Sequence, residues 1–310
     1  GSLSGDGLSR MMRILRTFKY RFLGYPLISG FDAAEILEKG SSGLERFEAS
    51  ISLGRNPDVT FELVGESVVF KDYAGRLYKL KICDLEEIVK DPEKVYAVLN
   101  SGELVRVAEF SEGAYYQLIT PAPRTSPTLE ISGIRMHRTK DITPFEDAKR
   151  KVKFLKVRRH NKILDICTGL GYTAIWEKRF GGEVVSVEKD IRVLNLAEYN
   201  PWSEGLKDVE IILKDATEAI GEFENNSFDR ILNDPPRFTV SGELYSLSFF
   251  KEIWRILKPG GIYYQYTGFP EEKYRGKSII KGIGERLRKA GFYITFIREI
   301  GGFICKKSRY

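Results

Sequence analysis

Carboxylates stand where two short apolar runs of this 310-residue chain end, a position from which side chains can reach a ligand. The first run carries Asp165 and leads into a turn with Gly169 and Gly171, then into a helical pattern. Glycine suits such a turn because the backbone bends sharply and can approach a ligand closely. Glu188 closes the second run, at about the spacing where an acid accepts from ribose hydroxyls. The pattern predicts a nucleoside pocket.

Two features of the turn argue against a dinucleotide as its ligand. The third glycine of the dinucleotide fingerprint is missing after Gly171. Asp165 would repel a pyrophosphate, whereas its charge suits a cationic or amino-bearing ligand. We therefore expect the pocket to take a ligand that carries positive charge.

A third apolar run is followed by the segment 233–238, Asn-Asp-Pro-Pro-Arg-Phe. Proline favours extended backbone in the residue before it, so Asp234 should be held with its acceptors aimed into the pocket. We expect Asp234 to orient or deprotonate the attacking group, with Asn233 beside it. Arg237 could pair with a phosphate or carboxylate of the substrate. Phe238 could stack on a base or pack in the core.

The histidines and cysteines offer few further candidates. His137 could reach the pocket as a base or serve as a structural hydrogen-bonding residue. Arg135, from the same segment, is a candidate substrate contact. His160 ends a basic run and is expected at the surface. Cys167 lies in the glycine turn and is expected to be a small packed residue rather than a nucleophile.

Five motifs, in family order over residues 163–261, resemble those of class I S-adenosylmethionine-dependent methyltransferases. They are residues 163–174, Glu188, 213–216, 231–238 and 257–261. The runs Cys-Thr-Gly-Leu-Gly-Tyr-Thr-Ala and Asn-Asp-Pro-Pro-Arg-Phe look closest to a group of predicted archaeal methyltransferases of unassigned substrate. The resemblance implies an α/β fold, with a doubly wound, seven-stranded, mostly parallel Rossmann-like sheet and a smaller N-terminal α+β or β-rich domain.

The resemblance also implies S-adenosyl-L-methionine as cofactor and a role for each motif. Asp165 would face the methionine amino group, directly or through water, and the glycine turn would line the carboxylate end. Glu188 would bind both ribose hydroxyls. Asp215 would bind the adenine amino group, cap the short helix after it, or do both. The expected cofactor contacts are Asp165, Thr168, Gly169, Gly171, Tyr172, Glu188, Lys189, Asp215, Ala216 and Asn233.

The segment 233–238 departs from the family pattern at one position. In amino-methyltransferases of this class, a similar Asn-Pro-Pro-aromatic run bonds a target amino group and stacks its ring. Here Asp234 aligns with the first residue of that run, but Arg237 occupies the aromatic place and Phe238 follows it. This argues against simple exocyclic-amine methylation. The arrangement looks nearer to some ribosomal-RNA base methyltransferases.

Periodicity predicts the elements that must position these residues. Strands are expected at 162–166, 183–187, 209–213, 228–232, 261–266, 292–297 and 302–306, the last two flanking a glycine turn so that one runs antiparallel. Helices are expected at 172–180, 190–198, 241–257 and 277–290. We expect a basic arm at 1–30, an accessory substrate-holding domain at 31–125 and the cofactor-binding domain at 126–310.

The accessory domain and its borders follow from the same patterns. Its predicted strands lie between 46 and 82, at 104–110 and at 114–119, and its helices at 33–39 and 84–89. The segment 95–99 fits either a helix or a strand. Residues 121–127 are a linker by composition. A hairpin is expected at 129–138, and a helix is expected to open at Pro144.

Composition limits the partners and the compartment. The net charge of +6 and a pI of about 9.0 favour a polyanionic partner. Residues 10–21 contain five basic residues, in a possible amphipathic helix, and 149–162 contain eight, with no acid in either segment. These are phosphate contacts or solvated faces. The three spaced cysteines suggest a reducing cytosol without a metal site, and no apolar run is long enough for a membrane span.

The sequence therefore predicts a cytoplasmic S-adenosylmethionine-dependent methyltransferase that modifies RNA, on a base of tRNA or rRNA. Two alternatives stay open. One is an aminopropyltransferase-like enzyme acting on a polyamine, which would need carboxylates beyond Asp234 to hold a polycation. The other is a non-catalytic RNA-binding module with a vestigial cofactor site.

Overall fold

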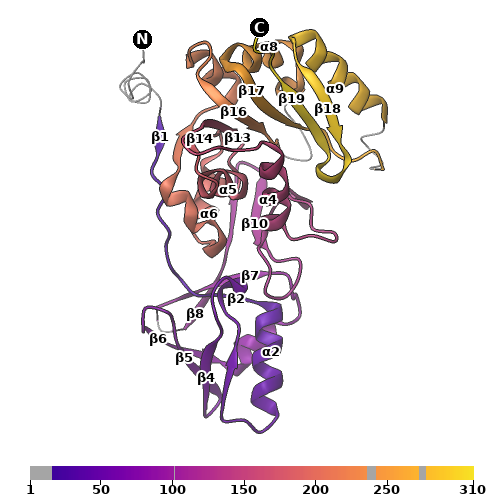
Figure 1. Cartoon of the computed structure of the whole chain (residues 1–310). Helices are drawn as coiled ribbons and strands as arrows, with labels where there is room; N and C mark the ends of the chain where they lie inside the picture. Colours follow the sequence, from indigo (N-terminus) through magenta and orange to yellow (C-terminus); the bar gives the residue numbers. More distant parts are fainter. Residues whose placement is uncertain (1–15, 101, 236–241, 272–276) are drawn as a thin grey trace. The chain divides into compact units, whose positions relative to one another are not determined.

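The computed structural model describes residues 16–100, 102–235, 242–271 and 277–310, which divide into two compact units (Figure 1). The first unit contains Phe145–Leu194 and Gly205–Tyr310, together with the segment that ends at Tyr20. The second contains Arg21–Pro144 and Asn195–Glu204. Each unit has its own sheets.

The first unit is built on one sheet with strand order β1-β15-β14-β13-β16-β17-β19-β18. Its strands are β1 (Thr17–Phe18), β13 (Lys162–Ile166), β14 (Glu183–Glu188), β15 (Glu210–Leu213), β16 (Phe228–Asn233), β17 (Leu257–Tyr266), β18 (Tyr293–Ile297) and β19 (Gly302–Lys306). The five central strands (β15, β14, β13, β16 and β17) run parallel. Strand β19 runs antiparallel to both β17 and β18. The predicted seven-stranded, mostly parallel sheet is thus confirmed.

An eighth strand comes from the basic arm, where the sequence allowed a helix. Thr17 and Phe18 pair antiparallel with Ile212 and Ile211 of β15. The backbone groups of β15 would otherwise stay unpaired at the edge of the sheet, and β1 satisfies them. These two residues of the arm therefore extend the sheet rather than forming part of a helix.

Helices cover both faces of this sheet. The helices are α4 (Pro144–Phe154), α5 (Tyr172–Arg179), α6 (Ile191–Ala197), α7 (Ala216–Ala219), α8 (Leu247–Ile256) and α9 (Lys277–Ala290), with 3₁₀ turns η2 (Pro201–Asp208), η3 (Ile220–Glu222), η4 (Gly242–Tyr245) and η5 (Arg298–Ile300). The end of α6 and the start of η2 belong to the second unit. Leu164 and Ile166 of β13 join the core formed with α8 and α9. Because side chains alternate along a strand, Ile163 and Asp165 face the other side, where α5 packs against β13 and β14.

The second unit holds three small antiparallel sheets, ordered β12-β11-β10-β9, β2-β7-β8 and β3-β4-β5-β6. Their strands are β2 (Leu27–Ser29), β3 (Arg46–Ala49), β4 (Val59–Val64), β5 (Ser67–Lys71), β6 (Leu77–Lys81), β7 (Val95–Leu99), β8 (Glu103–Arg106), β9 (Ala108–Ser111), β10 (Ala114–Ile119), β11 (Thr128–Ile131) and β12 (Ile134–Arg135). Helices α2 (Gly30–Ser41) and α3 (Ile82–Ile88) and the turn η1 (Ser52–Gly54) complete it. One face of the β3–β6 sheet packs on α2 and α3 in a second core.

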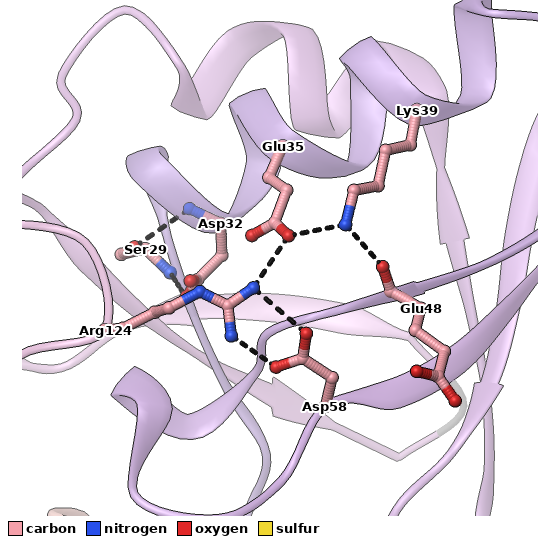
Figure 2. Close-up of polar contacts among 7 residues, drawn as sticks. All are labelled: Ser29, Asp32, Glu35, Lys39, Glu48, Asp58 and Arg124. Atoms are coloured by element: carbon pink, nitrogen blue, oxygen red, sulfur yellow. Dashed lines mark hydrogen bonds and ion pairs between the residues drawn. The ribbon is translucent and has the colours of Figure 1, made fainter.

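Residues 121–127, expected to be a linker, are part of the second unit and make ion pairs within it. Arg124 pairs with both carboxylate oxygens of Asp58, and its guanidinium also lies 2.8 Å from Glu35 of α2 (Figure 2). Lys39 continues this network, since its Nζ lies 2.8 Å from Glu35 and 2.7 Å from the carbonyl oxygen of Glu48. In the structure, the boundary between the two units lies after Pro144, whereas the sequence predicted it after residue 125.

The predicted hairpin is confirmed, because β11 and β12 pair antiparallel, and it belongs to the second unit, where β11 also pairs with β10. Two other local predictions for this unit differ from the structure. The expected strand 104–110 is divided at Val107, because its first half pairs with β7 and its second half with β10. Helix α3 begins at Ile82, two residues before the predicted start, and Asp84 lies in its first turn.

Candidate active site

The turn after β13 has the strained backbone that its glycines predict. Cys167, Gly169 and Gly171 have φ angles of 68°, 57° and 84°. A Cβ atom at Gly171 would lie 2.4 Å from a methyl carbon of Leu206, so only glycine fits there. Helix α5 starts at the next residue and directs its first amide groups toward the turn. A negatively charged group, such as the carboxylate of methionine, is suited to this position.

Glu188 ends β14 beside this turn and is 7% exposed. Its two carboxylate oxygens accept hydrogen bonds from the backbone N–H of Gly169 and of Asp190, both at 3.0 Å. Burial raises the pKa of Glu188, and these two donors oppose that rise. Each oxygen keeps a second lone pair, so the carboxylate can still accept from ribose hydroxyls.

Asp215 caps α7, the short helix after β15. Its Oδ1 atom accepts hydrogen bonds from the backbone N–H of Thr217 at 2.9 Å and from the Thr217 hydroxyl at 2.6 Å. The capping role is confirmed. Both bonds fall on one oxygen, and the contact with the adenine amino group stays a prediction.

Asp165 is buried completely, on the α5 side of β13. Its Oδ2 accepts from the Thr173 hydroxyl at 2.7 Å and its Oδ1 from the Ser186 hydroxyl at 2.8 Å. The Thr168 hydroxyl lies 2.6 Å from that of Ser186 and extends the network. Burial, the largest cause, raises the pKa of Asp165 to about 7. Asp165 therefore lies beneath the turn, and a direct contact with a cofactor amino group would require it to become exposed.

Asn233 and Asp234, at the end of β16, have different surroundings. Asn233 is fully buried on the side of α8, where its amide donates to the side chain of Gln265 at 2.8 Å and to the carbonyl of Leu244 at 3.3 Å. Its predicted catalytic and cofactor contacts stay predictions, and its observed bonds are structural. Asp234 follows the strand, keeps 23% of its side chain exposed and lies at the carboxyl edge of the sheet. Open α/β sheets bind their ligands at that edge.

Lys151 is the partner of Asp234, and sequence reasoning did not single it out. Its Nζ atom lies 2.9 Å from Oδ2 of Asp234 and 3.2 Å from Oδ2 of Asp147, and 5.1 Å from the ring centre of Tyr266. The two carboxylates keep the pKa of Lys151 well above its usual value although burial opposes this. The sequence feature that could have indicated an ion pair of Lys151 is its i, i+4 spacing from Asp147 on a predicted helix.

The remaining predicted residues belong to the second unit or have other partners. His137 belongs to the second unit, where its Nδ1 lies 2.8 Å from the Thr128 hydroxyl. Arg135 of β12 pairs there with Glu93 at 2.5 Å. The ring of Tyr172 packs edge-on against Phe145, and Lys189 and Ala216 are exposed and half-buried respectively. Arg237 and Phe238 lie outside the described residues.

Not all residues of the two basic segments lie near this site. Arg10 and Arg13 lie outside the described residues. In the second segment, Arg150 and Lys153 are exposed on α4. Arg158 and Arg159 are exposed just before β13 begins, at the amino edge of the sheet and so opposite the edge that carries Asp234.

Comparison with known proteins agrees with this geometry. A methyltransferase-domain family model matches residues 163–261. An uncharacterized protein of Methanocaldococcus jannaschii is 46% identical over 228 residues, which cover 73% of this chain and 77% of that protein. The chain belongs to the class I S-adenosylmethionine-dependent methyltransferases. Its cofactor is S-adenosylmethionine. The glycine turn with Glu188 and Asp215 at successive strand ends fits the methionine, ribose and adenine parts of that cofactor.

Two further relatives bear on the methyltransferase fold. The demethylmenaquinone methyltransferase of Staphylococcus aureus is 32% identical over 137 residues, covering 40% of this chain and 52% of that enzyme. The spermidine synthase of Thermotoga maritima superposes with a TM-score of 0.51 at 20% identity, covering 68% of this chain and 76% of that chain. At that identity the likeness concerns the fold. Among the described residues, no helix is long and apolar enough to cross a membrane.

Proposed function

We propose that this methyltransferase transfers the methyl group of S-adenosylmethionine to a base of an RNA substrate, with the acceptor group held against Asp234. The observation that carries the proposal is the placement of Asp234. It is partly exposed at the carboxyl edge of the sheet, one residue beyond β16, and Lys151 fixes one of its oxygens. The other oxygen, Oδ1, is the atom we assign to the acceptor.

Asp234 has two tasks in this proposal. Its Oδ1 accepts a hydrogen bond from an N–H or O–H of the acceptor, which aligns the attacking atom with the methyl carbon. Its carboxylate can take the proton that leaves as the bond to the methyl group forms. Most of the rate gain in such a transfer comes from holding two bound groups in line. When bound, the cofactor supplies the methyl group, and the protein supplies the alignment.

RNA as the substrate class is supported by the distribution of positive charge. Arg150 and Lys153 are exposed on α4, the helix whose Lys151 reaches Asp234. Arg158 and Arg159 are exposed at the far edge of the sheet, one strand length from Ile166. Five residues of strand span about 16 Å, a distance that a few nucleotides cover. A polyanion passing along α4 would meet basic side chains on its way to the pocket.

The proposal is tested with total RNA from a host that lacks this gene. Incubation with the purified protein and methyl-labelled S-adenosylmethionine should label RNA, and mass spectrometry of its nucleosides should identify one methylated base. Asp234→Asn should lower the labelling strongly. Absence of label in RNA, with label in a protein or small-molecule fraction of the same extract, would refute RNA as the substrate.

A second candidate, aminopropyl transfer to a polyamine, is favoured by one observation. Asp147 adds a second carboxylate beside Lys151, and its buried Oδ1 has no hydrogen-bond partner among the described residues. Two carboxylates around one ammonium leave a net negative charge, which suits a cationic acceptor. Calorimetric titration separates the candidates, because an aminopropyltransferase should bind the decarboxylated cofactor more tightly than S-adenosylmethionine.

A further inference from the structure

Glu177 of α5 is a buried carboxyl group that the predicted cofactor contacts do not include. It is completely buried, and neither of its carboxylate oxygens has a hydrogen-bond donor among the described residues. An ionised carboxylate in such a place would lose its hydration without any compensating donor or cation. We therefore treat Glu177 as the neutral carboxylic acid, which carries a proton that it can donate.

The acceptor for that proton is Asp165. Glu177 lies one helical turn after Thr173, the residue whose hydroxyl binds Oδ2 of Asp165, and both face β13. The backbone carbonyl of Glu177 and the side chain of Ile163 both lie next to Gly182, which places this end of α5 over β13. A proton on Glu177 could be donated to the Asp165 carboxylate, which would add a third donor to the hydroxyls of Thr173 and Ser186.

Few charged groups act on this carboxyl pair. Burial raises the pKa of Glu177 well above its usual value, and the nearby charge of Asp165 raises it further. Glu177 on α5 lowers the pKa of Asp165, and the negative charge of Asp234, at the end of β16, raises it. The Cys167 thiol in the turn also lies within electrostatic range of Asp165, and burial raises its pKa. The charges named here are carboxylates, and the state of the pair depends on them together with burial and hydrogen bonds.

We propose that Glu177 is a positioning residue for the cofactor site, a permanently protonated donor that stabilises the anionic form of Asp165 beneath the glycine turn. The proposal rests on the assignment of this turn to S-adenosylmethionine. The positively charged amino group of the bound cofactor favours the ionised form of Asp165 through the turn. Cofactor binding then expels a proton from Asp165 near neutral pH, and affinity increases as pH rises through about 7.

The test is calorimetric titration of the full-length protein between pH 5.5 and 8.5, in buffers of different ionisation enthalpy that count released protons. Both S-adenosylmethionine and S-adenosylhomocysteine serve as ligands, since they share the amino group and differ in the sulfonium charge. The variants are Glu177→Gln, which keeps a neutral donor, and Glu177→Met, which keeps the approximate size and removes the donor. Melting curves establish that each variant folds.

We expect the wild-type protein and Glu177→Gln to release protons with the same pH midpoint for both ligands. In Glu177→Met, the proton on Asp165 should be held more tightly, so the midpoint should move up by about one pH unit. Affinity at pH 7 should then fall by up to about tenfold, since each pH unit of competition is a factor of ten.

Three results would overturn the proposal. A shift of the midpoint to lower pH in Glu177→Gln would mean that Glu177 was charged in the wild-type protein. The comparison of Glu177→Gln with the wild-type protein decides the question even if Glu177→Met does not fold. Identical midpoints in all three proteins would mean that Glu177 does not act on Asp165. Proton release with S-adenosylmethionine alone would assign the effect to the sulfonium rather than to the amino group. Failure of the wild-type protein to bind either ligand at any pH would instead refute the cofactor assignment.

Discussion

Lys151 and Asp234, 83 residues apart in the sequence, form an ion pair of 2.9 Å at the carboxyl edge of the sheet. The side chain of Lys151 is 9% exposed, and its ammonium group also pairs with Asp147 of the same helix. This pairing links α4 to the segment that follows β16. It fixes the orientation of Asp234 before any substrate arrives, which is what alignment in a transfer reaction requires.

Replacing Lys151 by Met should destabilise the methyltransferase strongly. Two carboxylates would lose their buried cation, and breaking a buried pair in this way costs about 3–5 kcal/mol. Chemical denaturation of the first unit measures the change. Lys153→Met, at an exposed position on the same helix, is the matched control and should change stability by less than about 0.5 kcal/mol. Equal effects of the two substitutions would mean that the pair contributes nothing.

Replacing Glu188 by Ala should weaken S-adenosylmethionine binding by about 1.5–3 kcal/mol, because a charge-assisted acceptor for the ribose hydroxyls is lost. Isothermal titration measures the affinity. Glu188→Gln keeps one acceptor oxygen and should lose less. An unchanged affinity in a folded Glu188→Ala variant would remove the ribose role and leave Glu188 as a partner of the Gly169 and Asp190 backbone alone.

Stability should depend on pH through Asp32, the acid in the capping box of α2. Burial raises its pKa from 3.8 to about 7, although its bonds with Ser29 oppose the rise. Between these values the folded state holds a proton that the unfolded state has released, so this contribution to stability falls as pH rises from about 4 to 7. The slope is at most about 1.4 kcal/mol per pH unit. Asp32→Asn should flatten it in melting experiments, whereas exposed Glu86→Gln should not.

The order of elements in the first unit was predictable because its central strands are buried on both faces. Strands of this kind are nearly continuous apolar runs, and those that contain Leu164 and Ile231 are bounded by glycine, aspartate or proline. The predicted strands at 162–166 and 302–306 match β13 and β19 to the residue. The predicted helix at 277–290 matches α9 in the same way.

Contacts between distant segments were not predictable, since periodicity carries no information about partners. Lys151 stands in a basic run that looks solvated, and only the fold brings it to Asp234. Thr17 and Phe18 form a strand because they pair with the edge strand β15, and the sequence does not indicate this partner. The strand expected at 104–110 was divided because its two halves found different neighbours, a choice that alternating apolar residues do not encode.

If RNA is the substrate, its binding should weaken steeply with salt. The logarithm of the affinity should fall linearly with the logarithm of salt concentration, by roughly 0.7 for each phosphate contact with a single strand. Neutralising Arg158 and Arg159 with Gln should reduce this slope if both contact phosphates. The same change at exposed Arg288 and Lys289 of α9 is the control. Binding that does not depend on salt would identify the basic segments as solvated faces.

The sharpest prediction concerns Asp234→Asn, which keeps the shape of the side chain and removes its charge. Turnover should fall by about 10²-fold or more, the usual scale for a positioned acid–base group. Cofactor binding should persist, because Glu188 and the glycine turn are unaffected. Some stability should be lost, since Lys151 would keep only Asp147 as an anionic partner.

Asp147→Asn is the matched control for that loss of stability. It also leaves Lys151 with one carboxylate partner, but it preserves Asp234 at the carboxyl edge of the sheet. Both variants should therefore melt at lower temperature, while only Asp234→Asn should lose most single-turnover methyl transfer with cofactor bound. Equal losses of activity in the two variants would make the ion-pair cluster structural. Full activity in Asp234→Asn would move the catalytic role to another residue.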